Sequence, residues 1–201
     1  MSDFVLAGTG SRSLRTAPRG LQVEAMHLCT ERVAQRVLEH GSRLVVMSGM
    51  AEGFDELLAR VALRQGVRLW CVIPSKSYLR HYWGRNSLLE RDRLAEAGEI
   101  VGQAWKVTYV AEQILGTTAL KVDGLHINFH RNLFMTDAAD DFVVWDPTSA
   151  GTAHCVKAIR QAGKWRDDMV IGPESLSRAD MLPIGIVSGT PAPPEAMDRS
   201  R

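Results

Sequence analysis

Short runs of apolar residues alternate along the chain with segments in which apolar positions recur every three or four residues. The runs have the length of buried β-strands, and the periodic segments are typical of amphipathic helices. Strands that alternate with helices form a parallel sheet covered on both faces. We therefore predict an α/β fold, Rossmann-like and doubly wound, with a mainly parallel sheet in a single domain. The expected strands are Phe4–Ala7, Leu44–Met47, Leu69–Ile73, Val107–Val110 and Phe142–Trp145.

The periodic segments predict helices between these strands. In the first helix, Gly41 is suited to end the element. Further helices are expected near residues 57–66, 86–97, 128–139 and 152–162, the segment 86–97 being an exposed helix that ends at Gly98. Five residues at helical spacing are expected to face the sheet from the first helix: Val23, Met26, Thr30, Val33 and Val37.

Glycine-containing turns follow three of the predicted strands, at Gly8–Arg12, Ser48–Asp55 and Asp146–Thr152. The carboxyl ends of parallel strands meet at one edge of the sheet, so the three turns are expected to lie together and form a ligand site. Glycines let backbone N–H groups approach an anion, and a helix N-terminus favours phosphate. The first turn matches neither the GxGxxG fingerprint nor the P-loop, and taken alone it is more typical of a structural turn.

Charged side chains accompany these turns. Arg131, followed by Asn132, is expected to neutralise a phosphate. Asp55 either caps the second helix or holds a ribose hydroxyl. Glu52 is the other acid of the same turn and the weaker candidate for a catalytic carboxylate, with capping or dipole matching as the alternative role.

Other chemistry-bearing residues form weaker patterns. His126 and His130 lack a third ligand, so no metal site and no cofactor are predicted. Cys155 has no identifiable partner that would make it a nucleophile. The segment Lys76–Arg85 interleaves basic and aromatic residues, which predicts a loop suited to contact phosphate or a base.

Composition narrows the function classes. The 201 residues are 45% hydrophobic and carry a formal net charge of +1, which excludes a mostly disordered chain and disfavours a strongly basic nucleic-acid binder. Three separated cysteines, no signal-like apolar run and no membrane-spanning stretch predict a cytoplasmic protein. Five of the eight prolines follow Gly172, so we expect a domain over residues 1–171 and a mobile tail over residues 172–201.

Four separate motifs resemble the SLOG superfamily of Rossmann-like domains. The first two are Gly10–Arg12 and Ser48–Asp55. The third is Arg131-Asn132 followed by Met135 and Ala139-Asp140, and the fourth is Gly151–His154. Their order resembles the YpsA/YspA-related branch, which implies a nucleotide-derived small-molecule ligand; we also expect a homo-oligomer.

Two better-understood relatives imply different activities. LOG phosphoribohydrolases release the base from a nucleoside monophosphate, but their PGGxGTxxE motif has a glutamate where this chain has Cys155. The DNA-processing protein DprA has a similar SGxAxGxD turn and binds single-stranded DNA. We expect a nucleotide-binding protein whose N-glycosidase activity is uncertain, with a non-catalytic sensor or DprA-like DNA binding as alternatives. The candidate catalytic residues are Glu52 and Asp55, and the candidate ligand-binding residues are Gly8, Gly10, Ser11, Arg12, Ser48, Gly49, Gly53, Arg131, Asn132, Gly151 and Thr152.

Overall fold

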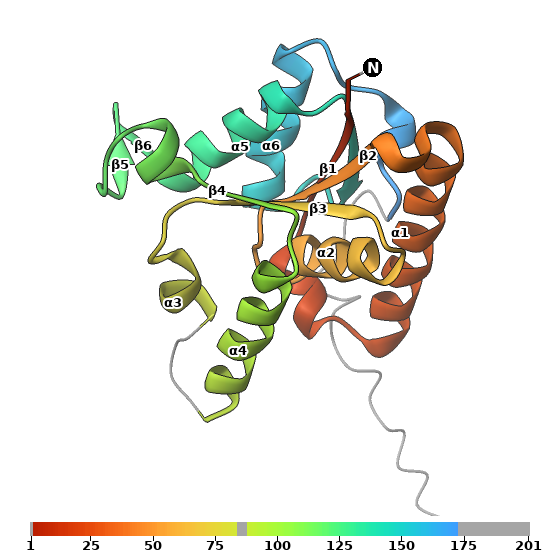
Figure 1. The fold of residues 1–201 in the computed structure, drawn as a ribbon, viewed down its shortest axis with the longest axis horizontal. Coiled ribbons are helices and arrows are strands. Elements are labelled where there is room, and N and C mark those ends of the chain that lie inside the picture. Colours follow the sequence, from red (N-terminus) through yellow and green to blue (C-terminus); the bar gives the residue numbers. More distant parts are fainter. Residues whose placement is uncertain (1, 84–87, 173–201) are drawn as a thin grey trace, which may run out of the picture.

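A sheet of five parallel strands forms the centre of the computed structural model, which describes residues 2–83 and 88–172 (Figure 1). The strand order is β4-β3-β2-β1-β7, and every neighbouring pair is parallel. The predicted parallel α/β fold is therefore confirmed. The strands are β1 (Phe4–Gly10), β2 (Leu44–Ser48), β3 (Arg68–Ile73), β4 (Lys106–Tyr109) and β7 (Asp141–Trp145).

Helices cover both faces of this sheet (Figure 1). One face packs against α1 (Arg19–His40) and α2 (Phe54–Arg64), and the other packs against α5 (Ile127–Ala138) and α6 (Ala150–Gln161). The short α3 (Tyr78–Trp83) and the longer α4 (Leu88–Gly102) follow β3. The smaller elements are the 3₁₀ turns Arg12–Thr16, Gly41–Arg43 and Asp167–Met169, the π-helical turn Val110–Ile114, and the hairpin of β5 (Lys121–Val122) and β6 (Leu125–His126).

Two apolar cores result from the alternation of side chains along the strands. Leu6 and Val46 belong to the core beneath α1 and α2, whereas their neighbours Val5, Ala7 and Met47 belong to the core beneath α5 and α6. Successive strand residues point to opposite faces, so a strand buried on both sides must be apolar at nearly every position. This explains why the strands are continuous apolar runs in the sequence. None of the helices within the described ranges is long and apolar enough to span a lipid bilayer.

The face of α1 that contacts the sheet differs in part from the prediction, which holds for Val33 and not for Val23 or Met26. Val23 and Met26 are 59% and 38% exposed, and the buried residues are Ala25, Cys29 and Val33, at a spacing of four. Two apolar stripes overlap on this helix. The stripe with the smaller side chains is buried because alanine and cysteine let α1 approach its neighbours more closely.

Two further expectations need correction. Part of the predicted Lys76–Arg85 loop is the helix α3, and its residues Tyr78 and Trp83 are buried. The helix α4 continues past Gly98 to Gly102 and buries Ile100, because its last turns pack over the sheet. The expected tail lies outside the described residues from position 173 onward.

Lys164, which follows α6, stabilises the C-terminal end of α5. Its ammonium group donates hydrogen bonds to the backbone oxygens of Thr136, Asp137 and Ala139, at 2.8, 3.1 and 2.8 Å. The last carbonyls of a helix lack intrahelical partners, and a cation there also interacts favourably with the helix dipole. Lys164 therefore holds together the two helices that border the candidate site described below.

Replacing Lys164 by methionine removes these three bonds but keeps the apolar stem. We expect Lys164→Met to lower the free energy of unfolding by about 1–2 kcal/mol, measured by urea denaturation. Lys157→Met is the matched control, because Lys157 is exposed on α6. Equal losses in the two variants would contradict the capping role of Lys164.

Candidate functional site

A cavity of about 500 Å³ lies at the carboxyl edge of the sheet. Its walls are the turn after β1, the turn before α2, the first turns of α5 and the start of α6. Cavities of this size bind small molecules in other proteins, and this edge is where ligands bind in open parallel sheets. The geometry thus agrees with the meeting of turns that the sequence predicts.

The cavity contains about half of the predicted site residues. The residues that line it are Gly10, Ser11, Arg12, Asp55, Arg131, Asn132 and Gly151. A second group does not line the cavity but lies in the elements around it: Gly8, Ser48, Gly49, Gly53 and Thr152.

Two glycines of the turn before α2 allow close contact with other parts of the site. Gly53 has a φ of +91°, and a Cβ atom there would lie 2.6 Å from the backbone oxygen of Ser11. A Cβ atom on Gly49 would lie 1.8 Å from Nη1 of Arg131. Side chains at either position would push the turn away from its neighbours. These glycines therefore bring the turn against both β1 and α5.

Arg131 and Asp55 form a buried ion pair at the base of the cavity. Nη1 of Arg131 donates to the backbone oxygen of Gly49 at 2.6 Å and to Oδ2 of Asp55 at 3.3 Å. Only 8% and 6% of the two side chains is exposed. Burial raises the pKa of Asp55, and the positive charge of Arg131 partly opposes that rise.

Asp55 is not the N-cap of α2, because Gly53 occupies that position and no side chain caps this helix. Instead, Asp55 lies in the first turn, and its carboxylate accepts a hydrogen bond from the backbone N–H of Ala51 at 3.4 Å. Ser48 supports the same turn by donating to the backbone oxygen of Asp55 at 2.7 Å. The carboxylate thus organises its own turn while also lining the cavity.

The N-terminus of α6 faces the cavity from the opposite wall. Its N-cap residue Ser149 makes no side-chain capping bond, and its hydroxyl is instead 2.7 Å from the hydroxyl of Thr152. Ala150 and Gly151, the first residues of the helix, line the cavity. Free N–H groups at the start of a helix carry partial positive charge and bind anions. This wall is therefore suited to an anionic group.

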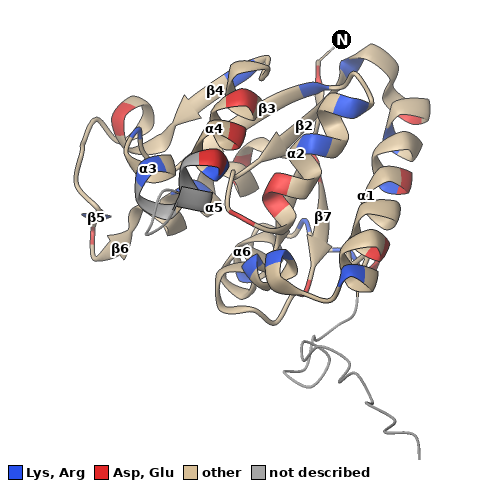
Figure 2. Cartoon of the chain, turned by 90° about the horizontal axis from the view of Figure 1, so that it is seen from below, with Lys and Arg blue, Asp and Glu red and all other residues tan. Residues whose placement is uncertain are grey.

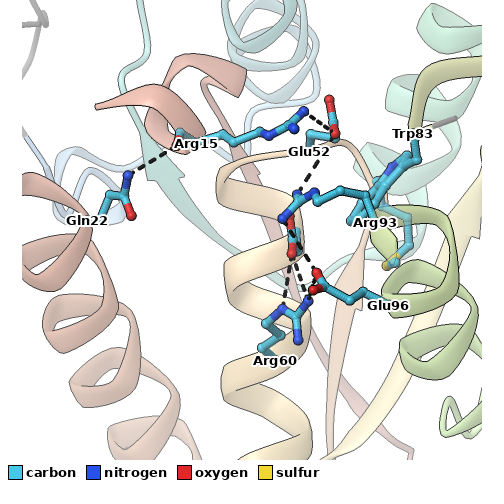
Figure 3. Close-up of polar contacts among 9 residues, drawn as sticks. Arg15, Gln22, Glu52, Arg60, Trp83, Arg93 and Glu96 are labelled. Carbon is cyan, nitrogen blue, oxygen red and sulfur yellow. Dashed lines mark hydrogen bonds and ion pairs between the residues drawn. The ribbon is translucent and has the colours of Figure 1, made fainter. Parts of the chain in front are cut away.

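Glu52, the weaker catalytic candidate, does not line the cavity. Its carboxylate forms an ion pair with Arg15 and lies 3.9 Å from Nη2 of Arg93 (Figure 3). Cys155, which occupies the position of the LOG glutamate, is buried, and burial raises the pKa of its thiol to about 11. Among the described residues that line the cavity, Asp55 is the one carboxylate.

The first turns of α5 contribute residues that the sequence did not single out. Asn128 lies on the same helix face as Arg131 and Asn132, at steps of three and four, and this spacing was the available signal. Phe129 also lines the cavity and packs against the ring of His154, with 4.2 Å between the ring centroids. Of the two histidines that the sequence analysis considered, His126 lines the cavity, whereas His130 bonds to the backbone oxygen of Val122.

Neither the family models nor the curated protein sequences match this chain. Solved structures do resemble it. DNA processing protein A (DprA) from Streptococcus pneumoniae is 18% identical with a TM-score of 0.50, covering 87% of this chain and 52% of that chain. DprA from Helicobacter pylori is 15% identical with a TM-score of 0.53, and the match covers 81% of this chain and 63% of that chain. Its structure was described for its single-stranded DNA binding mode. A third structure, TM1055, is 15% identical with a TM-score of 0.47, and the match covers 82% of this chain and 71% of that chain.

This chain spans about half to two thirds of the length of the two DprA chains. At this level of identity the likeness establishes the fold and not the ligand. The parallel sheet with helices on both faces is the Rossmann-like fold that the two DprA structures share with this chain.

The buried position of Asp55 predicts how stability depends on pH. Because its pKa is raised, the contribution of Asp55 to folding is complete below its ordinary pKa of about 4 and is lost as the pH rises through the raised value. Asparagine does not ionise. We therefore expect the stability of Asp55→Asn relative to the native protein to increase between about pH 4 and pH 7, measured by urea unfolding.

Asp137→Asn is the control for this measurement, since Asp137 is exposed on α5. Its difference from the native protein should change less over the same pH range. A relative stability of Asp55→Asn that falls as the pH rises would show that Arg131 holds the pKa of Asp55 below its ordinary value.

Proposed function

We propose that the cavity binds a nucleotide or a nucleotide-derived molecule through its phosphate group. The observation that carries this proposal is the uncapped N-terminus of α6, which faces the glycine turn after β1 across the cavity. The start of α6 offers backbone N–H groups, and Arg131 lies at the base of the cavity. The two DprA folds support placing the chain in the SLOG superfamily, whose members bind such ligands.

In this proposal the phosphate lies between the turn Gly10–Ser13 and the first turn of α6. The free N–H groups of the first turn of α6 would bind the phosphate oxygens. Arg131 contributes positive charge, although part of it is already paired with Asp55. Arg12, which also lines the cavity, contributes a second guanidinium group.

The sugar and base would then extend toward α5. Asp55 is placed to accept a hydrogen bond from a ribose hydroxyl, because its carboxylate lines the cavity beside Ala51. The amide of Asn128 and the ring of Phe129 provide polar and apolar contacts for a base. A cavity of about 500 Å³ has room for a nucleoside monophosphate.

We further propose that the protein senses its ligand and does not cleave it rapidly. Hydrolysis of an N-glycosidic bond develops positive charge on the sugar, which a carboxylate normally stabilises. Glu52 is held by arginines away from the cavity, and the thiol of Cys155 is neutral at physiological pH. Among the described residues that line the cavity, Asp55 is the one remaining candidate, and its side chain already contacts Arg131 and Ala51.

Phosphate binding predicts stabilisation by nucleotides in a thermal-shift experiment. A ligand at a hundred times its Kd adds about 2.7 kcal/mol, which corresponds to about 5–10 °C for a domain of this size. We expect a shift of this order with at least one nucleoside mono- or diphosphate and a much smaller shift with the matching nucleoside. Gly151→Asp should abolish the shift, because it places a negative charge where the phosphate would bind.

The site offers a matched control for this variant. A Cβ atom at Gly151 meets no atom within 4 Å, and an acid in the first turn of a helix favours the helix dipole, so Gly151→Asp should remain folded. Gly151→Ala should keep the shift. If no nucleotide stabilises the native protein, or if a nucleoside and its nucleotide give equal thermal shifts, the proposal of a phosphate site is wrong.

Single-stranded DNA binding is the second candidate, favoured by the DprA-like fold. An oligonucleotide that contacts several phosphates loses affinity steeply with salt, with a slope of about −0.7 per contact. Weak oligonucleotide binding at physiological salt is expected here. Nanomolar binding with a steep salt slope, unaffected by Gly151→Asp, would make DNA the better assignment.

Among the described residues, none offers a free carboxylate beside the proposed position of the sugar, and this predicts little or no turnover. Incubation with each nucleoside monophosphate that stabilises the protein should release no free base above the buffer blank over several hours, measured by chromatography. Should release occur, Asp55→Asn is expected to reduce it by about a hundredfold or more while the thermal shift persists. Rapid release by the native protein would instead identify it as an enzyme.

A further inference from the structure

A groove of about 380 Å³ lies between α1 and α2, apart from the cavity described above. The helix α1 lines it with Arg19, Gln22, Val23 and Met26, and α2 lines it with Gly53, Glu56, Leu57 and Arg60. Each set has the spacing i, i+3, i+4, i+7, which is one face of a helix over two turns. Such a pair of helix faces forms a hollow that fits a third helix.

The floor of the groove is partly apolar. Val23 and Met26 belong to the second stripe of α1, which the sheet does not bury, and they are 59% and 38% exposed. Leu57 adds a half-buried side chain from α2. An apolar stripe of this kind normally packs against another element.

The rim of the groove carries a small excess of positive charge. Glu56 is the one carboxylate that lines it, whereas four arginines do: Arg15, Arg19, Arg60 and Arg93. Glu56 accepts hydrogen bonds from Arg60 at 2.9 Å and from Arg93 at 2.7 Å (Figure 3). Glu52 and Glu96 pair with members of the same set from outside the groove.

Several of these arginines are held in place. Arg93 lies over the ring of Trp83, 5.2 Å from its centroid, and Trp83 donates to the backbone oxygen of Met50 at 3.0 Å. Arg19 differs, because it forms no ion pair with any residue in the described part of the chain. The groove thus combines positioned guanidinium groups with positive charge that is not fully compensated. Figure 2 shows that basic and acidic residues occur along both α1 and α2.

We propose that this groove docks an amphipathic helix of another protein, with apolar residues on one face and acidic residues beside them. The lining residues of α1 and α2 each span two helical turns, with the apolar side chains of Val23, Met26 and Leu57 at their centre, and this length matches anchors at i, i+3, i+4 and i+7 on the partner. The excess of arginine at the rim selects glutamate or aspartate on its flanks. The proposal does not depend on nucleotide binding in the cavity.

A synthetic peptide of about 15 residues tests the docking, with leucines at the four anchor positions and glutamates beside them. Its binding to the full chain is followed by fluorescence anisotropy. We expect saturable binding that weakens with salt, and a loss of about tenfold or more when lysine replaces every glutamate or when glutamine replaces every leucine. Equal binding of the three peptides, or no binding of the acidic peptide at millimolar protein, would overturn the proposal.

Variants of α1 show whether the peptide occupies this groove. Met26→Asp and Arg19→Glu should each weaken binding by about tenfold or more, since they oppose the apolar and the charged contacts. Leu38→Asp is the matched control, because Leu38 is 89% exposed on the same helix but outside the groove. If Met26→Asp binds as tightly as the native chain, the groove is not the docking site.

A second copy of the chain is the competing occupant of this surface. Sedimentation of the native chain and of Met26→Asp distinguishes the two cases. Self-association that Met26→Asp abolishes and Leu38→Asp leaves intact would assign the groove to a homo-oligomer and overturn the proposal of a different partner. An unchanged mass in both variants, together with peptide binding, supports it.

Discussion

The buried contact between Arg131 and the turn Ser48–Asp55 organises the carboxyl edge of the sheet. One guanidinium nitrogen reaches both the backbone oxygen of Gly49 and the carboxylate of Asp55. Removing one group of the pair would leave the other buried with backbone hydrogen bonds but without an opposite charge, and breaking a buried pair in this way is generally destabilising. This contact joins α5 to the turn before α2, and so keeps the walls of the cavity at a fixed separation.

Much of the fold follows from the sequence because strands buried on both faces leave a distinct pattern. The runs at Leu44–Met47 and Leu69–Ile73 are apolar at every position, and helices with glycine near their ends separate them. The contact face of α1 does not follow, since Val23 and Met26 form a stripe as regular as the buried one. The distance at which α1 packs against its neighbours decides which stripe is buried, and the sequence of α1 alone does not encode that distance.

The candidate site is predictable in outline and not in detail. The glycine turns mark the edge of the sheet where the cavity lies, because parallel strands bring their ends together whatever the side chains are. The roles of Glu52 and Asp55 depend on partners far along the chain, Arg93 and Arg131. Two acids three residues apart therefore look equivalent in the sequence, whereas in the fold one lines the cavity and the other joins a group of arginines.

The turn that contains Glu52 and Gly53 also has two sides. Ala51 and Asp55 line the cavity, and Gly53 and Glu56 line the groove between α1 and α2. A ligand in the cavity and a helix in the groove would thus both contact the backbone segment of residues 51–56. By thermodynamic linkage, if one occupant changes the affinity for the second by some factor, the second changes the affinity for the first by the same factor. If both proposals hold, a displacement of this turn would be a route by which a small molecule in the cavity changes the affinity of the groove for a protein partner.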